Sequence, residues 1–244
     1  MRVIGAGRAG GSLSGALASV GWMVEPPLRR GDDVARAADH VDLLVIATPD
    51  AAVAEVAAAV DPRPGTVVSH LSGALGLDAL EPHPRRAPIH PLVALPDAER
   101  GARRLTTGVT FALAEGGDPL GAEVVADLGG RALTVADADR AAYHAAACIA
   151  SNHLVALLGQ AQRVAALAGV PLDAYLDLVR GTVDNIEALG PHAALTGPAS
   201  RGDWATIERH LAAMPAAEHE TYQAMVAEAR HLVDAGRPTN EGAP

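Results

Sequence analysis

The residues with the clearest chemical potential lie in the segment YHAAACIASN, residues 143–152. If this segment is helical, the four-residue spacing of His144, Cys148 and Asn152 places them along one slowly drifting face. A histidine there offers a proton near neutral pH, and an asparagine amide can hold a carbonyl or carboxylate oxygen. Reduction of a carbonyl needs such groups, because negative charge grows on the oxygen as hydride reaches the carbon. His144 and Asn152 are therefore catalytic candidates, with packing or helix capping as the alternative role.

Three glycines at the start of the chain predict a phosphate-binding turn. Gly5, Gly7 and Gly10 follow the apolar pair Val3 and Ile4 and precede a helical pattern from Ser12 to Ala18. The first glycine permits the turn, the second lets backbone approach a pyrophosphate, and the third lets the helix pack on the strand. The unpaired N–H groups of the helix N-terminus then face the anion. The turn, with Arg8 and Ala9 inside it, predicts a dinucleotide site.

Two arginines indicate which dinucleotide this site prefers. A strand expected near residues 22–26 leads into Arg29 and Arg30, where an NAD enzyme usually carries an acidic residue. A guanidinium binds a 2′-phosphate that a carboxylate would repel, so the pattern favours NADP(H). Glu25 is the competing acid, and the alternative is that both arginines are solvated loop charges.

Strands and helices alternate through the first half of the chain, which predicts an α/β fold with a doubly wound, mainly parallel sheet. The apolar run 41–47 predicts a strand covered on both faces, and Thr48 and Pro49 follow it where such sheets bind ligands. A strand over 66–70 leads into Ser72 and Gly73, and a further strand end is expected at 89–91. Thr48, Pro49 and Ser72 are cofactor candidates. Helices are expected over 51–60 and 119–128, and strands over 108–114 and 132–135.

After residue 137 the pattern is helical, with one helix of about thirty residues expected over 139–168. Further helices are expected over 172–189, 204–214 and 216–235, and a frayed tail over 236–244. The sequence therefore predicts two domains, residues 1–136 for the cofactor and an all-α domain, residues 137–244, for substrate binding and dimerisation.

Composition narrows the function classes. The net charge of −10 argues against nucleic acid and anionic membranes as partners, and no run of twenty uninterrupted apolar residues predicts a membrane span. One cysteine excludes an internal disulfide and fits a cytoplasmic location. The ten histidines show no close-set ligand spacing, so no metal site is expected and a metal-dependent hydrolase is a weak alternative. All 19 basic residues are arginine, which rules out a catalytic lysine.

Four segments resemble a bacterial family of Rossmann-like proteins with a C-terminal domain of unknown function: SHLSGALG (69–76), IHPL (89–92), YHAAACIASNHLVALL (143–158) and ALTGPASRGDWATIERHL (194–211). The resemblance covers nearly the whole chain. It extends, more distantly, to ketopantoate reductase, pyrroline-5-carboxylate reductase and other relatives of 6-phosphogluconate dehydrogenase. It implies an NADP-binding domain, a helical domain often used for dimerisation, and reduction of a small keto or imino acid, with ketopantoate as the leading substrate. Some relatives of the fold use a deazaflavin instead.

The sequence departs from these relatives at two places. Keto-acid reductases typically carry a lysine four residues before the helix asparagine, and here Cys148 stands four residues before Asn152. The proton donor is therefore expected at His144 or at His90, in the loop after a strand. The first strand is also unusually short.

Substrate contacts are expected from Ser72 and Gly73, from Ser151, and from Thr196 and Arg201 in a polar loop where Asp203 fits a helix cap. Two functions compete with a keto-acid reductase: an imine reductase and a catalytically silent NADP-binding sensor or scaffold.

Overall fold

The computed structural model of the chain describes residues 1–235, which form two compact units, residues 1–152 and residues from His153 onward. The boundary expected after residue 136 precedes this division. Residues 137–152, the first part of the helix that follows, belong to the first unit, where Asp137 accepts from the Leu77 N–H and Tyr143 contacts His90. The residues expected to form a tail, 236–244, lie outside the described part.

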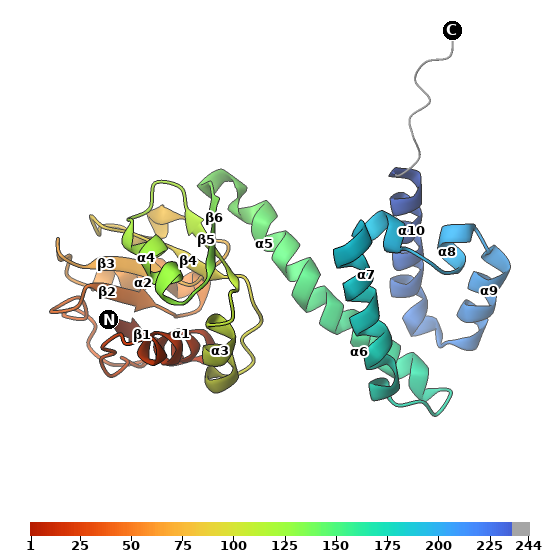
Figure 1. Cartoon of the computed structure of the whole chain (residues 1–244). Coiled ribbons are helices and arrows are strands. Elements are labelled where there is room, and N and C mark those ends of the chain that lie inside the picture. The colour runs from red at the N-terminus through yellow and green to blue at the C-terminus, as the bar shows by residue number, and fades with distance from the viewer. Residues whose placement is uncertain (236–244) are drawn as a thin grey trace, which may run out of the picture. The chain divides into compact units, whose positions relative to one another are not determined.

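The first unit is a mainly parallel α/β fold, as predicted, but its strands form two three-stranded sheets and not one (Figure 1). In the first sheet, β1 (Arg2–Ile4), β2 (Leu43–Ile46) and β3 (Val67–His70) run parallel in that order. In the second, β5 (Thr110–Ala114) is parallel to β6 (Arg131–Val135) and antiparallel to β4 (Ile89–Pro91). The β1 strand is short, as expected from the sequence.

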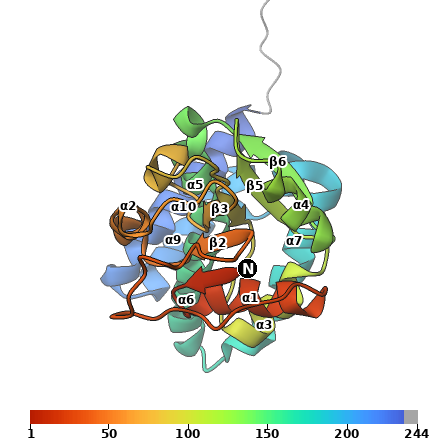
Figure 2. The ribbon, with the colours of Figure 1, turned by 90° about the vertical axis from the view of Figure 1, so that its left-hand side faces the viewer.

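Helices cover both faces of the central strand β2, which is why its sequence is apolar throughout. Leu43 and Val45 pack in a core with the helix α1 (Arg8–Ser19), whereas Leu44 and Ile46 pack in a second core with α2 (Asp50–Ala59). The helices α2 and α4 (Leu120–Asp127) lie on opposite sides of this unit (Figure 2). The unit also contains η1 (Leu77–Leu80), α3 (Ala98–Leu105) and the first part of the long helix that begins after residue 136.

Two local predictions in this unit are wrong. Residues 22–26 form no named strand. The segment instead runs beside β1 through a single bridge at Leu28 and hydrogen bonds from the N–H groups of Glu25 and Leu28, because Pro26 and Pro27 have no N–H to donate. His90 lies inside β4 and not in the loop after a strand. The helix α3, beside α1, was not expected.

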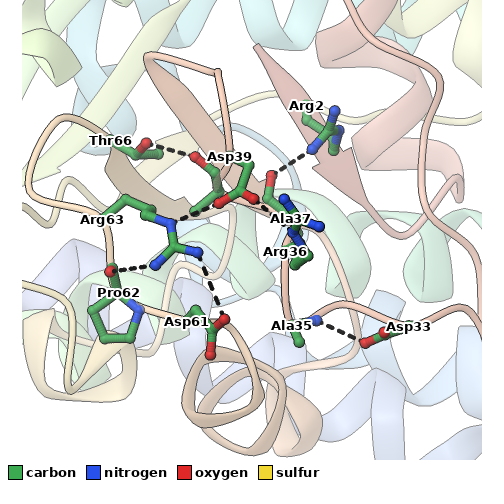
Figure 3. Close-up of polar contacts among 11 residues, drawn as sticks. Arg2, Asp33, Ala35, Arg36, Ala37, Asp39, Asp61, Pro62, Arg63 and Thr66 are labelled. Carbon is green, nitrogen blue, oxygen red and sulfur yellow. Dashed lines mark hydrogen bonds and ion pairs between the residues drawn. The ribbon is translucent and has the colours of Figure 1, made fainter.

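An ion-paired network fastens the chain at the opposite edge of the first sheet, before β2 and β3 begin (Figure 3). Arg63 donates to Asp39 at 2.6 Å, and Arg36 donates to the same carboxylate at 2.9 Å. The Thr66 hydroxyl is 2.8 Å from the carbonyl of Ala38. These contacts fix the turn before β3 against the loop before β2. Because they lie at the amino ends of the two strands, the carboxyl ends stay free for a site.

The long helix is present, but it contains a π turn. It runs as η2 (Asp137–Asp139), α5 (Arg140–Cys148), the π-helical segment η3 (Ile149–His153) and α6 (Leu154–Ala166). A π turn closes hydrogen bonds between residues five apart. The step from Cys148 to Asn152 therefore advances less far around the axis than in an α-helix, which partly offsets the drift expected along that face.

The second unit is helical, as expected. The helix α7 (Leu176–Ala194) has a non-helical kink at Gly190 just before Pro191. Asp203 caps α9 (Trp204–Ala213) by accepting from the Thr206 N–H at 3.1 Å. Among described residues from 153 onward, only Gln160, Ala165 and Ile207 are buried. This unit comprises α6 with η4 (Leu172–Tyr175), α7 (Leu176–Ala194), α8 (Pro198–Arg201), α9 (Trp204–Ala213), η5 (Ala216–Glu218) and α10 (His219–Ala235).

By length and composition, the helical stretch Asp137–Ala166 is apolar enough to cross a membrane, with a mean hydropathy of 1.3 over its most apolar window. Mean hydropathy is a weaker requirement than an unbroken run of twenty apolar residues, because polar residues such as His144 and Asn152 can lie inside the window. A single such helix is weak evidence for a membrane span. The absence of a membrane partner stays a prediction.

Candidate functional site

The glycine turn has the geometry of a phosphate cradle. Gly5 has a φ of +103°, and a Cβ there would lie 2.6 Å from the carbonyl oxygen of Ala47. A Cβ on Gly10 would overlap the carbonyl oxygen of Gly5 and lie 2.9 Å from Val3 Cγ1. Gly7 differs, since a Cβ there would meet no described atom within 4 Å. Gly5 and Gly10 are therefore required by the fold, whereas Gly7 opens on free space at the N-terminus of α1.

Other predicted cofactor residues lie along the same edge of the sheet. Thr48 follows β2, and its Oγ1 is buried without a hydrogen-bond partner in residues 1–235. Arg29 and Arg30 are exposed directly after Leu28, which bonds to β1. Pro49 caps α2, whereas Arg8 and Ala9 open α1. An unpaired buried hydroxyl and an open glycine fit a polar ligand lying across this edge.

Ser72 has a structural role that the sequence did not reveal. Its hydroxyl donates to Asp50 Oδ2 at 2.7 Å and accepts from the N–H groups of Ala74 and Leu75. Its own N–H donates to Nδ1 of His70 at 3.2 Å. The polar groups expected to bind cofactor or a substrate carboxylate are thus already paired, and the Asp50 carboxylate would repel an anion beside them.

A histidine–tyrosine pair forms the centre of the site. The Tyr143 hydroxyl lies 2.6 Å from Nδ1 of His90, and the two rings meet edge to face. His144 also packs edge to face on His90, and its Nε2 lies 3.8 Å from Sγ of Cys148. A Cβ on Gly73 would come within 3.0 Å of both histidine rings, so this glycine admits them to the edge of the sheet. The structure thus brings three predicted residues together: His90, His144 and Gly73.

Burial keeps two histidines of the site neutral. Burial, together with the nearby charges of His144 and Arg140, lowers the pKa of His90 to about 4. The pKa of His70 is lowered chiefly by burial, and its Nε2 lies 3.1 Å from the carbonyl oxygen of Gly76. Burial also raises the pKa of Tyr143, although the charge of Arg140 opposes that rise. At neutral pH His90 and Tyr143 are therefore both uncharged, and Tyr143 keeps its hydroxyl proton.

Four residues of this site were missed in the sequence: Asp50, His70, Arg140 and Tyr143. The partner of Tyr143 is 53 positions away, so no local spacing reveals the pair. Arg140 did carry a local signal, because a cation in the first turn of a helix opposes the helix dipole.

The remaining predicted residues lie away from this cluster or outside the first unit. Asn152 is exposed and Ser151 half-buried, both within the π turn. Thr196 and Arg201 are exposed in the second unit. Their substrate contacts stay predictions. Within residues 1–235 no three histidine, cysteine or acidic side chains are grouped so as to hold a metal ion.

Two domain families match the chain. A Rossmann-like domain matches residues 26–96, and a domain of unknown function, DUF2520, matches residues 109–229. The chain is a Rossmann-like protein with a DUF2520 domain. This agrees with the resemblance drawn from the sequence. No curated protein matches it in sequence.

Solved structures share the fold of this Rossmann-like protein over almost its whole length. A protein of Thermotoga maritima is 24% identical with a TM-score of 0.73, covering 97% of this chain and 99% of its own. A Bacteroides fragilis protein assigned as an NADP oxidoreductase is 20% identical with a TM-score of 0.77, covering 94% and 97%. A reductive aminase of Aspergillus terreus, solved with NADPH, is 16% identical with a TM-score of 0.70, covering 97% and 98%.

Proposed function

We propose that this protein is an NADPH-dependent reductase of a small 2-oxo acid, with the reduction of ketopantoate to pantoate as the first reaction to test. One observation carries the proposal. The glycine turn and the His90–Tyr143 pair lie on the same unit, joined through the adjacent carboxyl ends of β1, β2 and β3 and the Gly73 loop. A dinucleotide cradle at the first sheet thus lies in the same unit as a proton-donating pair whose His90 packs against the loop after β3.

The chain's residues fit NADPH. The α1 N-terminus and Gly7 would hold the pyrophosphate, Arg29 and Arg30 the 2′-phosphate, and Thr48 a polar group between them. When bound, NADPH supplies a hydride. Solved relatives of the fold include proteins described as NADP oxidoreductases, imine reductases and pyrroline carboxylate reductases, which supports this choice of cofactor.

The proton comes from the His90–Tyr143 pair. If Nδ1 of His90 carries the hydrogen, Tyr143 donates its own proton to the developing oxyanion and the tyrosinate accepts a hydrogen bond from Nδ1. If Nδ1 is bare, Nε2–H of His90 donates to the oxyanion while the Tyr143 proton moves to Nδ1. Tyr143 ends as tyrosinate in both cases and regains a proton from solvent, since it is only half-buried.

An imine substrate is the alternative within the same chemistry, because an imine nitrogen also needs a proton as hydride arrives. The reductive aminase and imine reductase relatives of the fold favour it. A silent NADP-binding sensor is the alternative without chemistry.

The second unit supports a homodimer. Its exposed apolar side chains include Val155, Leu178 and Leu189, each at least 60% exposed, and a helical unit with three buried residues needs a further surface to cover them. A second copy of this chain is the occupant that we propose. A cytoplasmic location stays a prediction.

The test is a titration with NADPH and NADH followed by cofactor fluorescence. We expect NADPH to bind more tightly, and Arg29→Ala with Arg30→Ala to weaken NADPH by about tenfold or more while leaving NADH unchanged. The matched control is Arg100→Ala with Arg103→Ala, two exposed arginines on α3.

Turnover is then measured with ketopantoate, other 2-oxo acids and a cyclic imino acid. Turnover of the imino acid alone would replace the keto-acid reaction by the imine reaction. Tight NADPH binding without oxidation by any of them would favour the sensor, and binding of neither cofactor would refute the reductase.

A further inference from the structure

Arg140 is a buried cation that lacks partners for most of its hydrogen-bonding groups. Its side chain is 1% exposed, and its Nε donates to Asp137 Oδ1 at 3.1 Å. Nη1 and Nη2 are buried and have no hydrogen-bond partner within residues 1–235. A buried charged group with unpaired N–H groups destabilises a fold, so such an arginine is retained for a reason other than stability.

Asp137, the carboxylate that Arg140 contacts, is poorly placed to neutralise it. Asp137 is 44% exposed at its side chain, and its Oδ2 already accepts from the N–H of Leu77 at 3.0 Å. Arg140 also stands in the first turn of α5, where the helix dipole adds to the positive potential. The local field therefore favours a second anion.

The charge of Arg140 reaches the catalytic candidates. Arg140 stands three residues before Tyr143, so both lie on one face of α5. Its charge acts on Tyr143 and also on His70 and His90. The carboxylate contact predicted at Ser72 has no free donor and faces Asp50. Within residues 1–152, the buried cation beside this pair is Arg140.

The geometry points to Arg140 as the residue that binds the carboxylate of the substrate, so that its planar guanidinium and two free Nη groups select an acid over an uncharged carbonyl compound. This inference rests on the proposed reductase function and deepens it. Both Nη atoms are closed to solvent. Binding of a carboxylate to them therefore requires neighbouring side chains to move aside.

The test uses oxamate, a carboxylate that resembles a 2-oxo acid and accepts no hydride. Oxamate is titrated calorimetrically into the full chain, with and without NADPH. We expect Arg140→Gln to weaken oxamate binding by about tenfold or more, and Arg140→Lys to weaken it less, because an ammonium keeps the charge without the planar fork. The control Arg103→Gln removes an exposed arginine paired with Glu99 and should leave binding unchanged.

Thermal unfolding separates a binding role from a structural one. If Arg140 is kept for binding, Arg140→Gln unfolds at or above the midpoint of the unchanged protein, since a buried charge with two unpartnered Nη groups has been removed. A lower midpoint together with unchanged oxamate affinity would overturn the inference. Should Arg140→Gln fail to fold, the Nε–Hε resonance of Arg140 in the unchanged protein, assigned with Arg140→Lys, must shift on adding oxamate, and an unmoved resonance refutes direct binding.

The two proposals fail separately. Oxamate binding that depends on Arg140 in a protein that ignores NADPH would refute the reductase and keep the anion site. NADPH binding and turnover in a protein whose oxamate affinity is the same within twofold in Arg140→Gln would keep the reductase and refute the anion site. No oxamate binding at millimolar concentration would also refute it.

Discussion

Tyr143 places its hydroxyl 2.6 Å from Nδ1 of His90, joining the helix α5 to the strand β4 across 53 positions of sequence. The chain contains a second pair of the same kind, because the Tyr222 hydroxyl lies 2.6 Å from Nδ1 of His210 with the rings again edge to face. The first pair is half-buried in the first unit, whereas the second is exposed on the helical unit. Comparing variants of the two pairs therefore separates a role in catalysis from the effect of losing a tyrosine–histidine hydrogen bond.

Removing the Tyr143 hydroxyl should slow turnover without affecting cofactor binding. Tyr143→Phe keeps the ring contact with His90 and deletes the proton, so we expect kcat to fall by about 10²-fold or more while NADPH affinity holds. Tyr222→Phe is the matched control and should leave kcat unchanged. Equal kcat for Tyr143→Phe and the unchanged enzyme would remove Tyr143 from the mechanism.

The neutral state of His90 should make stability fall in acid. Burial lowers the pKa of His90 to about 4, so the unfolded chain binds its proton first as pH decreases. Its contribution is present in full above about pH 6.5 and is lost as pH falls toward 4, up to about 3 kcal/mol. Urea unfolding at pH 7 and 4.5 should show a smaller loss for His90→Gln than for the unchanged protein.

The exposed His153 provides the control for that measurement, since His153→Gln should keep the original pH dependence. An identical acid loss in His90→Gln would contradict a neutral buried imidazole at this position. His70 is shifted in the same direction by burial, so part of the loss persists in either single variant.

Two glycine variants distinguish fold from cofactor binding. Gly10→Ala puts a methyl group against the carbonyl of Gly5 and Val3, and should destabilise the protein by about 1–3 kcal/mol. Gly7→Ala meets no described atom within 4 Å and should change stability by less than about 0.5 kcal/mol. If a pyrophosphate lies in that space, Gly7→Ala nevertheless weakens NADPH binding. Unaltered NADPH affinity in a stable Gly7→Ala variant would place the phosphates elsewhere.

Charge on the apolar surface of the second unit should dissociate the proposed homodimer. Val155→Asp on α6 and Leu178→Asp on α7 each put a carboxylate on an exposed apolar side chain. Light scattering should give a dimer for the unchanged chain and a monomer for the double variant. Met23→Asp, on the 87% exposed Met23 of the first unit, is the control. A monomeric unchanged chain, or one that partitions into lipid vesicles, would contradict this assembly.

Local patterns in the sequence sufficed for most of the fold. The unbroken apolar run around β2 predicted a strand covered on both faces, and its alternate residues do pack into two cores. A strand was wrongly predicted over 22–26. The segment does lie beside β1, but only the backbone N–H groups of Glu25 and Leu28 donate to it, on either side of two prolines, so no regular strand forms. The π turn was not predictable, since the α and π patterns differ by one hydrogen-bond register within the same residues.

Site residues could be predicted where their role depends on neighbours in the sequence. They could not be predicted where the role depends on a residue brought close by the fold. Gly5 and Gly10 followed from strand–turn–helix order, whereas the role of Ser72 depends on the distant Asp50 and that of His90 on Tyr143. Arg140 is a cation at the start of α5, where the helix dipole disfavours positive charge. A residue that conflicts with its local structure in this way is often functional.

The single thiol of the chain gives the site a built-in reporter position. Cys148 is half-buried with its Sγ 3.8 Å from His144 Nε2, and no other cysteine competes with it. A small trifluoromethyl label attached there gives one fluorine resonance from the chain without any mutation. Its shift would report ligand occupancy beside the histidines directly, independent of absorbance or hydride loss.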